Sequence, residues 1–575
     1  MKGPYGDPGF PIPKFVIVNR QSAIVNILQV IFMYERAIAA ILLVVVGSAP
    51  VSAQSAAGAQ LLPGMGDYSH PIQTTNPEAQ RFFDQGLALL YNFNHAEAER
   101  SFLKAAELDP KAPMPWWGVG IALGLNYNRD VTKLEGERLM RAYDAAQKAV
   151  MLSRGGSPVE AALADALATR YSRDANADPN VLNAQYRDAM RQVYARYPDD
   201  PEGGTMYADA VMNLRPWQLW KRDGTPEADT LELVKVLEAV LRRHPNHPGA
   251  NHYYVHAVEA SPTPERALAS ATRLEALVPG AGHLVHMPTH IYIHTGHIGR
   301  VAELNVKAAA ADERYIEVAK PEGLYPFMYY GHNVHFVVVG NLLIGRYEDA
   351  LKAGRQMADL VGPHVAQMAP MVEWALALPT LAHVRFHKWD AILAAPRPPD
   401  SQPLARSFDH YARALALRMM GKAAEARTEA AAFETARGKV PAETLVVSFN
   451  NGPTVLAMVS HLLQGQLAGS VDEAVTHLEM AAAAQDALNY DEPEPWPWSV
   501  RETLGAVLLK AGRAVEAEKV FRTDLEKNPA SGRTLFGLTK SLEAQGRTAE
   551  AAIVQREFDE AWKQATSPLS VDALF

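Results

Sequence analysis

Apolar residues recur at helical spacing through most of the chain, and the pattern is clearest between residues 79 and 110. That segment, AQRFFDQGLALLYNFNHAEAERSFLKAAELDP, carries Gly86 and two alanines where paired helices need close contact, and a polar stretch near Asn92 that predicts a turn. Pro110 closes the unit, because proline cannot continue a helix. The pattern therefore predicts two antiparallel helices joined by a short turn.

The same unit returns near the C-terminus, where Gly512 and Gly546 are separated by one full repeat period and are followed at the same interval by alanine, Ala517 and Ala551. This period and the segment 79–110 resemble the tetratricopeptide repeat. The resemblance implies an all-α fold, an α-solenoid or superhelix of roughly eight to ten helical hairpins. It also implies that the first helix of each unit lines a concave groove.

We expect one continuous repeat domain over residues 76–566, because no second pattern of elements interrupts it. Residues 54–75 read as an extended lead-in segment, residues 567–575 as a C-terminal tail, and residues 244–340 as histidine-rich central repeats. Insertions that break the period at about 215–228, 314–328 and 391–403 predict loops on the rims of the superhelix.

Residues 1–53 are interpreted as an N-terminal extension and signal peptide, with Met33 as a possible true start. The short apolar run from Ala37 to Val46 precedes an A-x-A-like cleavage pattern before Gln54. This run is too short to span a bilayer, so cleavage is favoured over a membrane anchor. The expectation is a periplasmic or secreted protein without stable membrane insertion.

Composition narrows the chemistry. A net charge of -9 and the absence of a lysine or arginine run give no electrostatic footprint for nucleic acid, which we exclude as a partner. The chain has no cysteine, so disulfides, thiolate nucleophiles and zinc–thiolate clusters are impossible. A bound metal would depend on histidine, carboxylate, tyrosine or backbone oxygen.

Histidines gather in the central repeats at three repeated registers, each defined by its interval from a helix-packing position that recurs as Ala267, Val301 and Ala350. His252, His286 and His335 share the first register. His256 and His290 share the second, one helical turn closer to the packing position, and His283 and His332 share the third, about one turn further from it. Helical geometry also adds Glu259 to the face of the first pair and His294 to that of the second. The candidate metal ligands are His252, His256, Glu259, His283, His286, His290, His294, His332 and His335.

Clustered neutral imidazoles with a carboxylate are a ligand set for transition metals, and copper is favoured, with zinc or iron as alternatives. The zinc-protease pattern H-E-x-x-H is absent, since Tyr253 and Tyr254 follow His252, which weakens hydrolysis. We therefore expect a metal-dependent oxidoreductase acting on a small molecule in the groove, with Glu259 as the candidate catalytic residue. Two alternatives stay open: a non-enzymatic scaffold whose groove binds a partner peptide, and a periplasmic protein for metal binding or delivery.

The run from His286 to Tyr292, HMPTHIY, also resembles a group of exported bacterial tetratricopeptide proteins in which H-M-P-x-H-I-Y recurs. This second resemblance supports the repeat fold and the unity of the motif. It implies no reaction, so function has to be argued from the site.

Overall fold

The computed structural model describes residues 59–128, 134–174, 176–321 and 325–575, which belong to one compact unit spanning residues 53–575. The expected signal peptide and its cleavage position lie outside the described residues. Within the described residues, no helix combines the length and the apolar character needed to cross a membrane.

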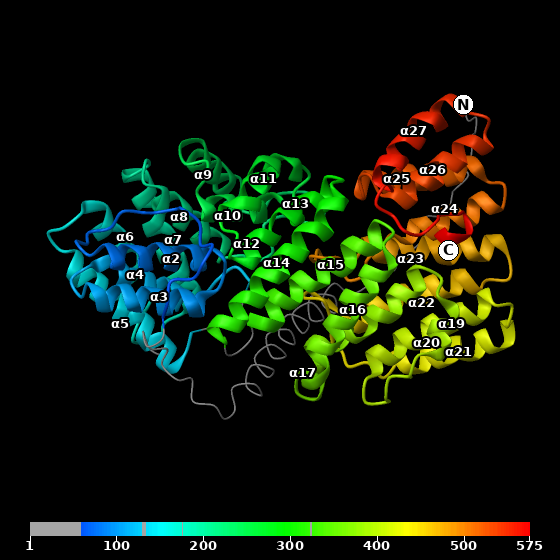
Figure 1. Ribbon diagram of the computed structural model, residues 1–575, viewed down its shortest axis with the longest axis horizontal. Coiled ribbons are helices and arrows are strands. Elements are labelled where there is room, and N and C mark those ends of the chain that lie inside the picture. Colours follow the sequence, from blue (N-terminus) through cyan, green and yellow to red (C-terminus); the bar gives the residue numbers. More distant parts are fainter. Residues whose placement is uncertain (1–58, 129–133, 175, 322–324) are drawn as a thin grey trace, which may run out of the picture. The chain divides into compact units, whose positions relative to one another are not determined.

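Helices follow one another as antiparallel pairs along the described chain, from α2 in blue to α27 in red, and the all-α solenoid is confirmed (Figure 1). Proline occupies one of the first helical positions in many of them, where its missing N–H costs nothing. The first half comprises α2 Pro77–Tyr91, α3 His95–Leu108, α4 Pro113–Ala122, α5 Gly136–Ser153, α6 Pro158–Ala168, α7 Pro179–Arg196, α8 Pro201–Met212, α9 Thr230–Arg243, α10 Pro248–Val258, α11 Leu268–Leu277, α12 Gly282–His286, α13 Pro288–His294 and α14 Ile298–Ala319.

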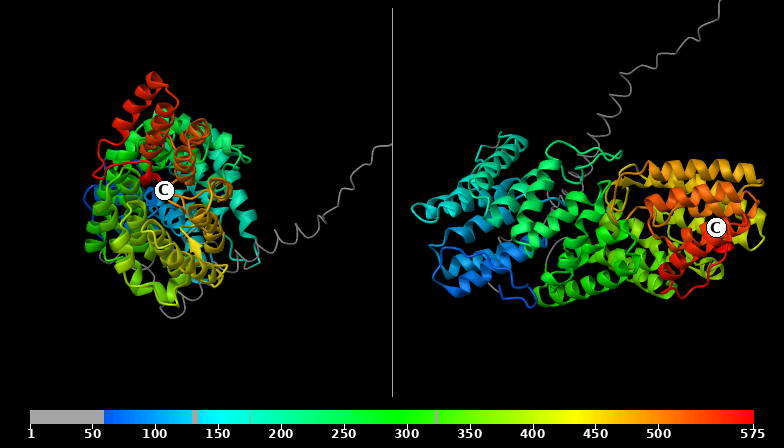
Figure 2. Two further views of the ribbon diagram at one scale, coloured as in Figure 1. Left: turned by 90° about the vertical axis from the view of Figure 1, so that its right-hand side faces the viewer. Right: turned by 90° about the horizontal axis from the view of Figure 1, so that it is seen from above.

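The second half continues in the same way, and a short hairpin of strands, β1 Leu445–Val446 and β2 Asn450–Asn451, interrupts it. The view from above in Figure 2 shows these later helix pairs side by side. They are α15 Gly331–Leu343, α16 Tyr347–Val361, α17 Val365–Val372, α18 Leu378–Arg385, α19 Trp389–Ala394, α20 Pro403–Met419, α21 Ala423–Arg437, α22 Gly452–Leu467, α23 Val471–Asp486, α24 Val500–Lys510, α25 Ala514–Lys527, α26 Gly532–Ala544 and α27 Thr548–Ala561.

Glycine–phenylalanine contacts hold the hairpins together at both ends of the array. A Cβ atom on Gly86 would lie 2.4 Å from the ring of Phe102, and one on Gly118 would lie 2.5 Å from the same ring. A Cβ atom on Gly505 would lie 2.3 Å from the ring of Phe521, and one on Gly537 would lie 2.2 Å from the same ring. Because no larger residue fits at these positions, adjacent units approach closely enough to bury the aromatic ring completely.

The insertion at 314–328 is only partly a loop, so that expectation was wrong in part. α14 runs on to Ala319, because its apolar stripe continues through the buried Tyr315, and a π-helical turn from Pro326 to Tyr330 leads into α15. The lead-in segment packs along the repeats, where Gly64 O accepts a hydrogen bond from Gly280 N. The C-terminal tail folds back, and Leu574 O accepts one from Thr503 Oγ1.

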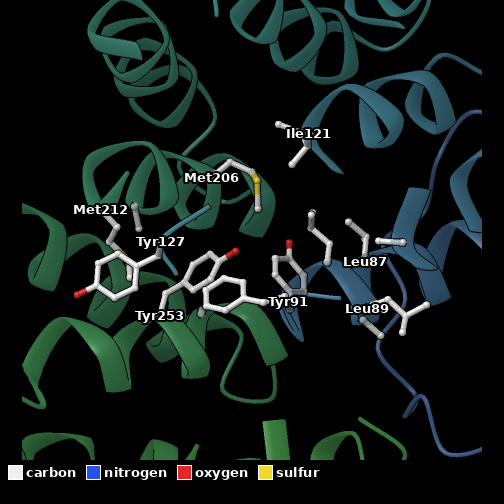
Figure 3. Close-up of a cluster of buried hydrophobic side chains, with 14 of the residues drawn as sticks. Leu87, Leu89, Tyr91, Ile121, Tyr127, Met206, Met212 and Tyr253 are labelled. Carbon is white, nitrogen blue, oxygen red and sulfur yellow. The ribbon is translucent and has the colours of Figure 1, made fainter. Parts of the chain in front are cut away.

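The core beside the central repeats contains tyrosines as well as aliphatic side chains. Figure 3 shows Tyr91, Tyr253 and Tyr127 in a row below Met206 and Met212. Tyr91 ends α2 and Tyr253 lies on α10, with 5.9 Å between their ring centroids. This packing sets α2 against α10, and α10 is the first of the helices that carry the clustered histidines.

Candidate metal centre

Three neighbouring repeats bring six histidines together. α10 supplies His252 and His256, the nearly continuous pair α12 and α13 supplies His283, His286 and His290, and α15 supplies His332. Pro288 occupies the first position of α13, where a proline is compatible with a helix. The potential ligand atoms of the six histidines form two groups of three, each within 4.8 Å of one another, and Glu259 forms a third such group with His256 and His290. We call His252, His256 and His283 the first triad, and His286, His290 and His332 the second triad.

The first triad is buried and short of hydrogen-bond partners. His252 Nδ1 donates to the backbone oxygen of Tyr91 over 2.6 Å, and His256 Nδ1 donates to Glu259 Oε1 over 2.9 Å. The Nε2 atoms of both rings, and both nitrogens of His283, have no partner in the described part of the chain. A buried polar atom without a partner costs about 1–3 kcal/mol, so this arrangement calls for a ligand.

In the second triad, three Nε2 atoms converge. His286 Nε2 lies 2.8 Å from His290 Nε2 and 3.1 Å from His332 Nε2. Asn305 Nδ2 donates to Val301 O and Thr289 Oγ1, which leaves Asn305 Oδ1 to accept from His286 Nδ1 over 2.6 Å. His286 therefore carries its proton on Nδ1, and its Nε2 presents a lone pair. At these distances each nitrogen pair needs a proton on one of the two facing Nε2 atoms or a metal ion between them.

Glu259 joins the two triads. Its Oε1 accepts from His256 Nδ1, and its Oε2 accepts from His290 Nδ1 over 2.5 Å. Burial alone would raise the pKa of Glu259, but the two facing imidazoles outweigh burial and lower the pKa to about 2. Burial lowers the pKa of His256, whereas Glu259 outweighs burial at His290 and raises its pKa. With both oxygens engaged, Glu259 orients two imidazoles, the role that carboxylates play behind metal-bound histidine.

The two triads are related by the repeat itself. In each, two ligands occupy the first and second registers of one unit, and the remaining ligand occupies the third register of the next unit. His252 and His256 thus correspond to His286 and His290, and His283 corresponds to His332. The repeated registers in the sequence showed that these positions are equivalent. They did not show that the third histidine of each triad lies next to the pair from the preceding unit.

The flanking repeats do not continue the pattern. Before the first triad, the equivalent positions hold Thr205, Asp209 and Gly249. A Cβ atom on Gly249 would lie 2.4 Å from the ring of Tyr91, so that ring occupies the space of a third ligand. After the second triad, the equivalent of the i,i+4 pair is His335 and Val339, which offers a single imidazole.

The structure therefore leaves three of the expected ligands outside both triads: Glu259, which holds His256 and His290, and the histidines His335 and His294. His335 is buried against Trp374, with 4.6 Å between ring centroids, and burial lowers its pKa to about 3. His294 Nε2 pairs with Glu492 Oε1 over 2.5 Å. Glu492 comes from the segment between α23 and α24, 198 residues away in sequence, and nothing in the spacing of the motif pointed to it.

Aromatic rings enclose the triads. Phe93 contacts His252 and His283 with centroid distances of 4.6 Å and 5.4 Å, and Trp217 lies 5.4 Å from His256. Both residues have positive φ, 54° and 61°, which is strained backbone for a side chain of that size. We expected the histidines to line an open groove. Five of the six are instead almost fully buried, and only His332 is half-buried.

The donor set fits a transition metal. Around an ion with metal–nitrogen bonds of about 2.0–2.1 Å, tetrahedral ligand atoms lie about 3.3 Å apart. Two nitrogen pairs of the second triad, 2.8 Å and 3.1 Å apart, are slightly closer than this, and the ligand nitrogens of the first triad lie within 4.8 Å of one another. Three imidazoles per ion leave a further coordination position for a reactant.

Comparison with known proteins adds little to this picture. No family model matches the chain, and no curated protein matches it either. Among solved structures, the human IFIT1 dimer with m7Gppp-AAAA has a TM-score of 0.29 and 11% identity, and the match covers 86% of this chain and 92% of that chain. Yeast Tom70 has a TM-score of 0.27 and 12% identity, covering 84% of this chain and 97% of its own. Likenesses at this level carry no argument about the site.

Proposed function

We propose that this protein is a metal-dependent oxidoreductase with a six-histidine centre that holds two metal ions, one in each triad. The observation that carries the proposal is the set of unpartnered ring nitrogens in the first triad, together with the three converging Nε2 atoms of the second triad, which repeats the first in register. Copper is the favoured metal, because both triads offer imidazole alone and the chain has no cysteine. Zinc and iron remain the alternatives.

The triad histidines would bind the metal ions, and the residues around them orient the imidazole rings. His252, His256 and His283 would hold one ion, and His286, His290 and His332 the other. Redox-active ions held there would supply electron transfer between dioxygen and a small reduced substrate. Glu259, Asn305 and the carbonyl of Tyr91 keep the protons on Nδ1, so that Nε2 stays available for binding. The enclosing aromatic rings exclude water from the histidines.

The test is metal analysis of untagged protein with an oxygen-uptake screen. The wild type is expected to carry about two ions per chain, and His252→Ala with His256→Ala, or His286→Ala with His290→Ala, to lose about one each. Removing all metal with a chelator is expected to abolish oxygen uptake, and one particular ion is expected to restore it.

The matched control is His461→Ala with His477→Ala, a stacked histidine pair outside both triads, which is expected to keep the metal. Metal-free wild-type protein, or equal loss in control and triad variants, contradicts the proposal. Bound metal without any oxygen uptake would favour metal storage or delivery. Peptide binding that is insensitive to chelation would favour a scaffold.

We also propose export to the periplasm or beyond, which the Ala37–Val46 segment supports. The mature chain is then expected to start at or near Gln54. Intact-mass measurement of the periplasmic fraction tests this start, and a membrane-bound chain that retains Ala37–Val46 would contradict it.

A further inference from the structure

One histidine of the HMPTHIY helix is engaged outside the triads. His294 follows His290 by one helical turn on α13, but its Nε2 pairs with Glu492 Oε1 over 2.5 Å instead of joining a ligand group. Tyr490 Oη donates to the same Glu492 oxygen over 2.5 Å, and the Tyr490 ring stacks 6.0 Å from the imidazole. The result is a histidine–carboxylate–tyrosine arrangement beside the centre.

The arrangement is built into the fold. Asp491 Oδ2 accepts hydrogen bonds from the backbone of Ser448 and Phe449, which ties the segment 489–492 to the hairpin of β1 and β2. Phe449 in turn packs 5.3 Å from Trp217, the ring that covers His256. The segment carrying Glu492 is therefore held to the same aromatic enclosure that surrounds the triads.

His294 is partly exposed to solvent, as His332 is, whereas the other five triad histidines are almost fully buried. Its side chain is 25% exposed, while that of Glu492 is 2% exposed. Glu492 engages Nε2 of His294, and Nδ1 of the same ring forms no hydrogen bond with the described residues. Burial alone would lower the pKa of His294, but Glu492, with Glu494 and Glu259 further off, raises it.

We propose that His294 is a proton-transfer residue for the centre, positioned by Glu492 and Tyr490, and is not a metal ligand. The inference rests on the proposed oxidoreductase function. Dioxygen that takes up electrons from the reduced substrate must also take up protons. The Nδ1–H bond of the His294 imidazolium breaks toward the oxygen, its electron pair stays on the ring, and water on the exposed side returns the proton.

The experiment compares His294→Gln and Glu492→Gln with the control His297→Gln, an exposed histidine near the same helix end. His294→Gln is expected to keep the full metal content and to lower oxygen uptake by about 100-fold or more, with partial rescue by added imidazole. Glu492→Gln is expected to keep the metal and to move the alkaline limb of the pH–rate profile to lower pH. The control is expected to match the wild type.

A second readout keeps the two proposals separable. Histidine-selective 15N labelling, with the His294 signal assigned from its absence in His294→Gln, is expected to show that Glu492→Gln lowers the His294 pKa by one unit or more. Loss of metal in His294→Gln would make it a ligand and overturn the inference. If Glu492→Gln leaves the His294 pKa unchanged, the inference is overturned as well, whether or not the protein takes up oxygen. A lack of oxygen uptake by itself counts only against the oxidoreductase function.

Discussion

Glu259 and His290 lie 31 residues apart in sequence, yet Glu259 Oε2 accepts a hydrogen bond from His290 Nδ1 over 2.5 Å in a nearly solvent-free site. The other oxygen of the same carboxylate holds His256. One carboxylate thus orients one histidine from each triad, and this placement makes Glu259 a positioning residue for both proposed metal sites.

Replacing this carboxylate by an amide tests that role. Glu259→Gln keeps the shape but offers one acceptor oxygen, and its NH2 group faces the Nδ1–H of the second imidazole. We expect metal affinity to fall by about 10–100-fold, the usual effect of losing a group that orients a metal-bound histidine. Competition with a chromophoric chelator measures it, and unchanged affinity in the variant would show that Glu259 plays no part in metal binding.

Two histidines on the same helix are expected to behave differently. His332→Ala removes a ligand of the second triad, so about one ion per chain should be lost. His335→Ala removes an imidazole that packs on Trp374, so the metal content should stay at the wild-type value although thermal stability falls. Metal analysis of both purified variants measures this difference. The grouping into triads is wrong if the two variants lose metal equally.

Gly249 packs against Tyr91, and Tyr91 in turn holds a histidine of the first triad. In Gly249→Ala the new methyl group would meet the Tyr91 ring at 2.4 Å, and the backbone oxygen of Tyr91 holds His252 Nδ1. We expect a loss of about 1–3 kcal/mol in the free energy of unfolding from overpacking, with weaker metal binding at the first triad only. Gly438→Ala is the control, because its nearest neighbour would be an ordinary contact at 3.5 Å. Denaturant unfolding and metal titration measure the two effects, and wild-type values for both in Gly249→Ala would contradict this coupling.

Asp491 makes stability depend on pH. Burial raises its pKa from 3.8 to about 7, and the hydrogen bonds from the backbone of Phe449 and Ser448 offset burial only in part. Between about pH 4 and pH 7 the folded state then binds more protons at this site than the unfolded state. Its contribution to the free energy of unfolding is therefore full below pH 4 and falls with rising pH, by at most about 1.4 kcal/mol per unit.

The asparagine oxygen in Asp491→Asn can accept the same hydrogen bonds without ionising. In this variant the free energy of unfolding should therefore lack the part of its slope against pH that comes from Asp491. Denaturant unfolding at a series of pH values provides the measurement. The exposed Asp199→Asn serves as the control and should keep the wild-type slope. A variant of Asp491 with an unchanged slope would mean that the carboxylate is already ionised in this range.

The fold followed from the sequence to a large extent, for a local physical reason. Helical periodicity, turn glycines such as Gly512 and the close approach of Gly86 to Phe102 depend on residues near one another in the chain. The same periodicity placed His252 and His256 on one face of α10, and His286 and His290 on one face of the following helix pair. Where a local pattern was weaker, as in the insertion at 314–328, the expected loop turned out to begin with helix.

The composition of the site depended on contacts that no local pattern contains. Packing between repeats, across as many as 198 residues of sequence, sets three features of the site. These are the unit that supplies the third histidine of each triad, the oxygen that accepts from Nδ1 of His252 and of His286, and the segment that contacts His294. Equal spacing could not separate His335 from His252 and His286, because spacing fixes a residue's place on its helix but not the partner that it faces. By itself the sequence determined the repeat array and the faces on which the histidines lie. Only the tertiary structure decided that six of them meet in two triads, because convergence of side chains depends on how neighbouring helices pack.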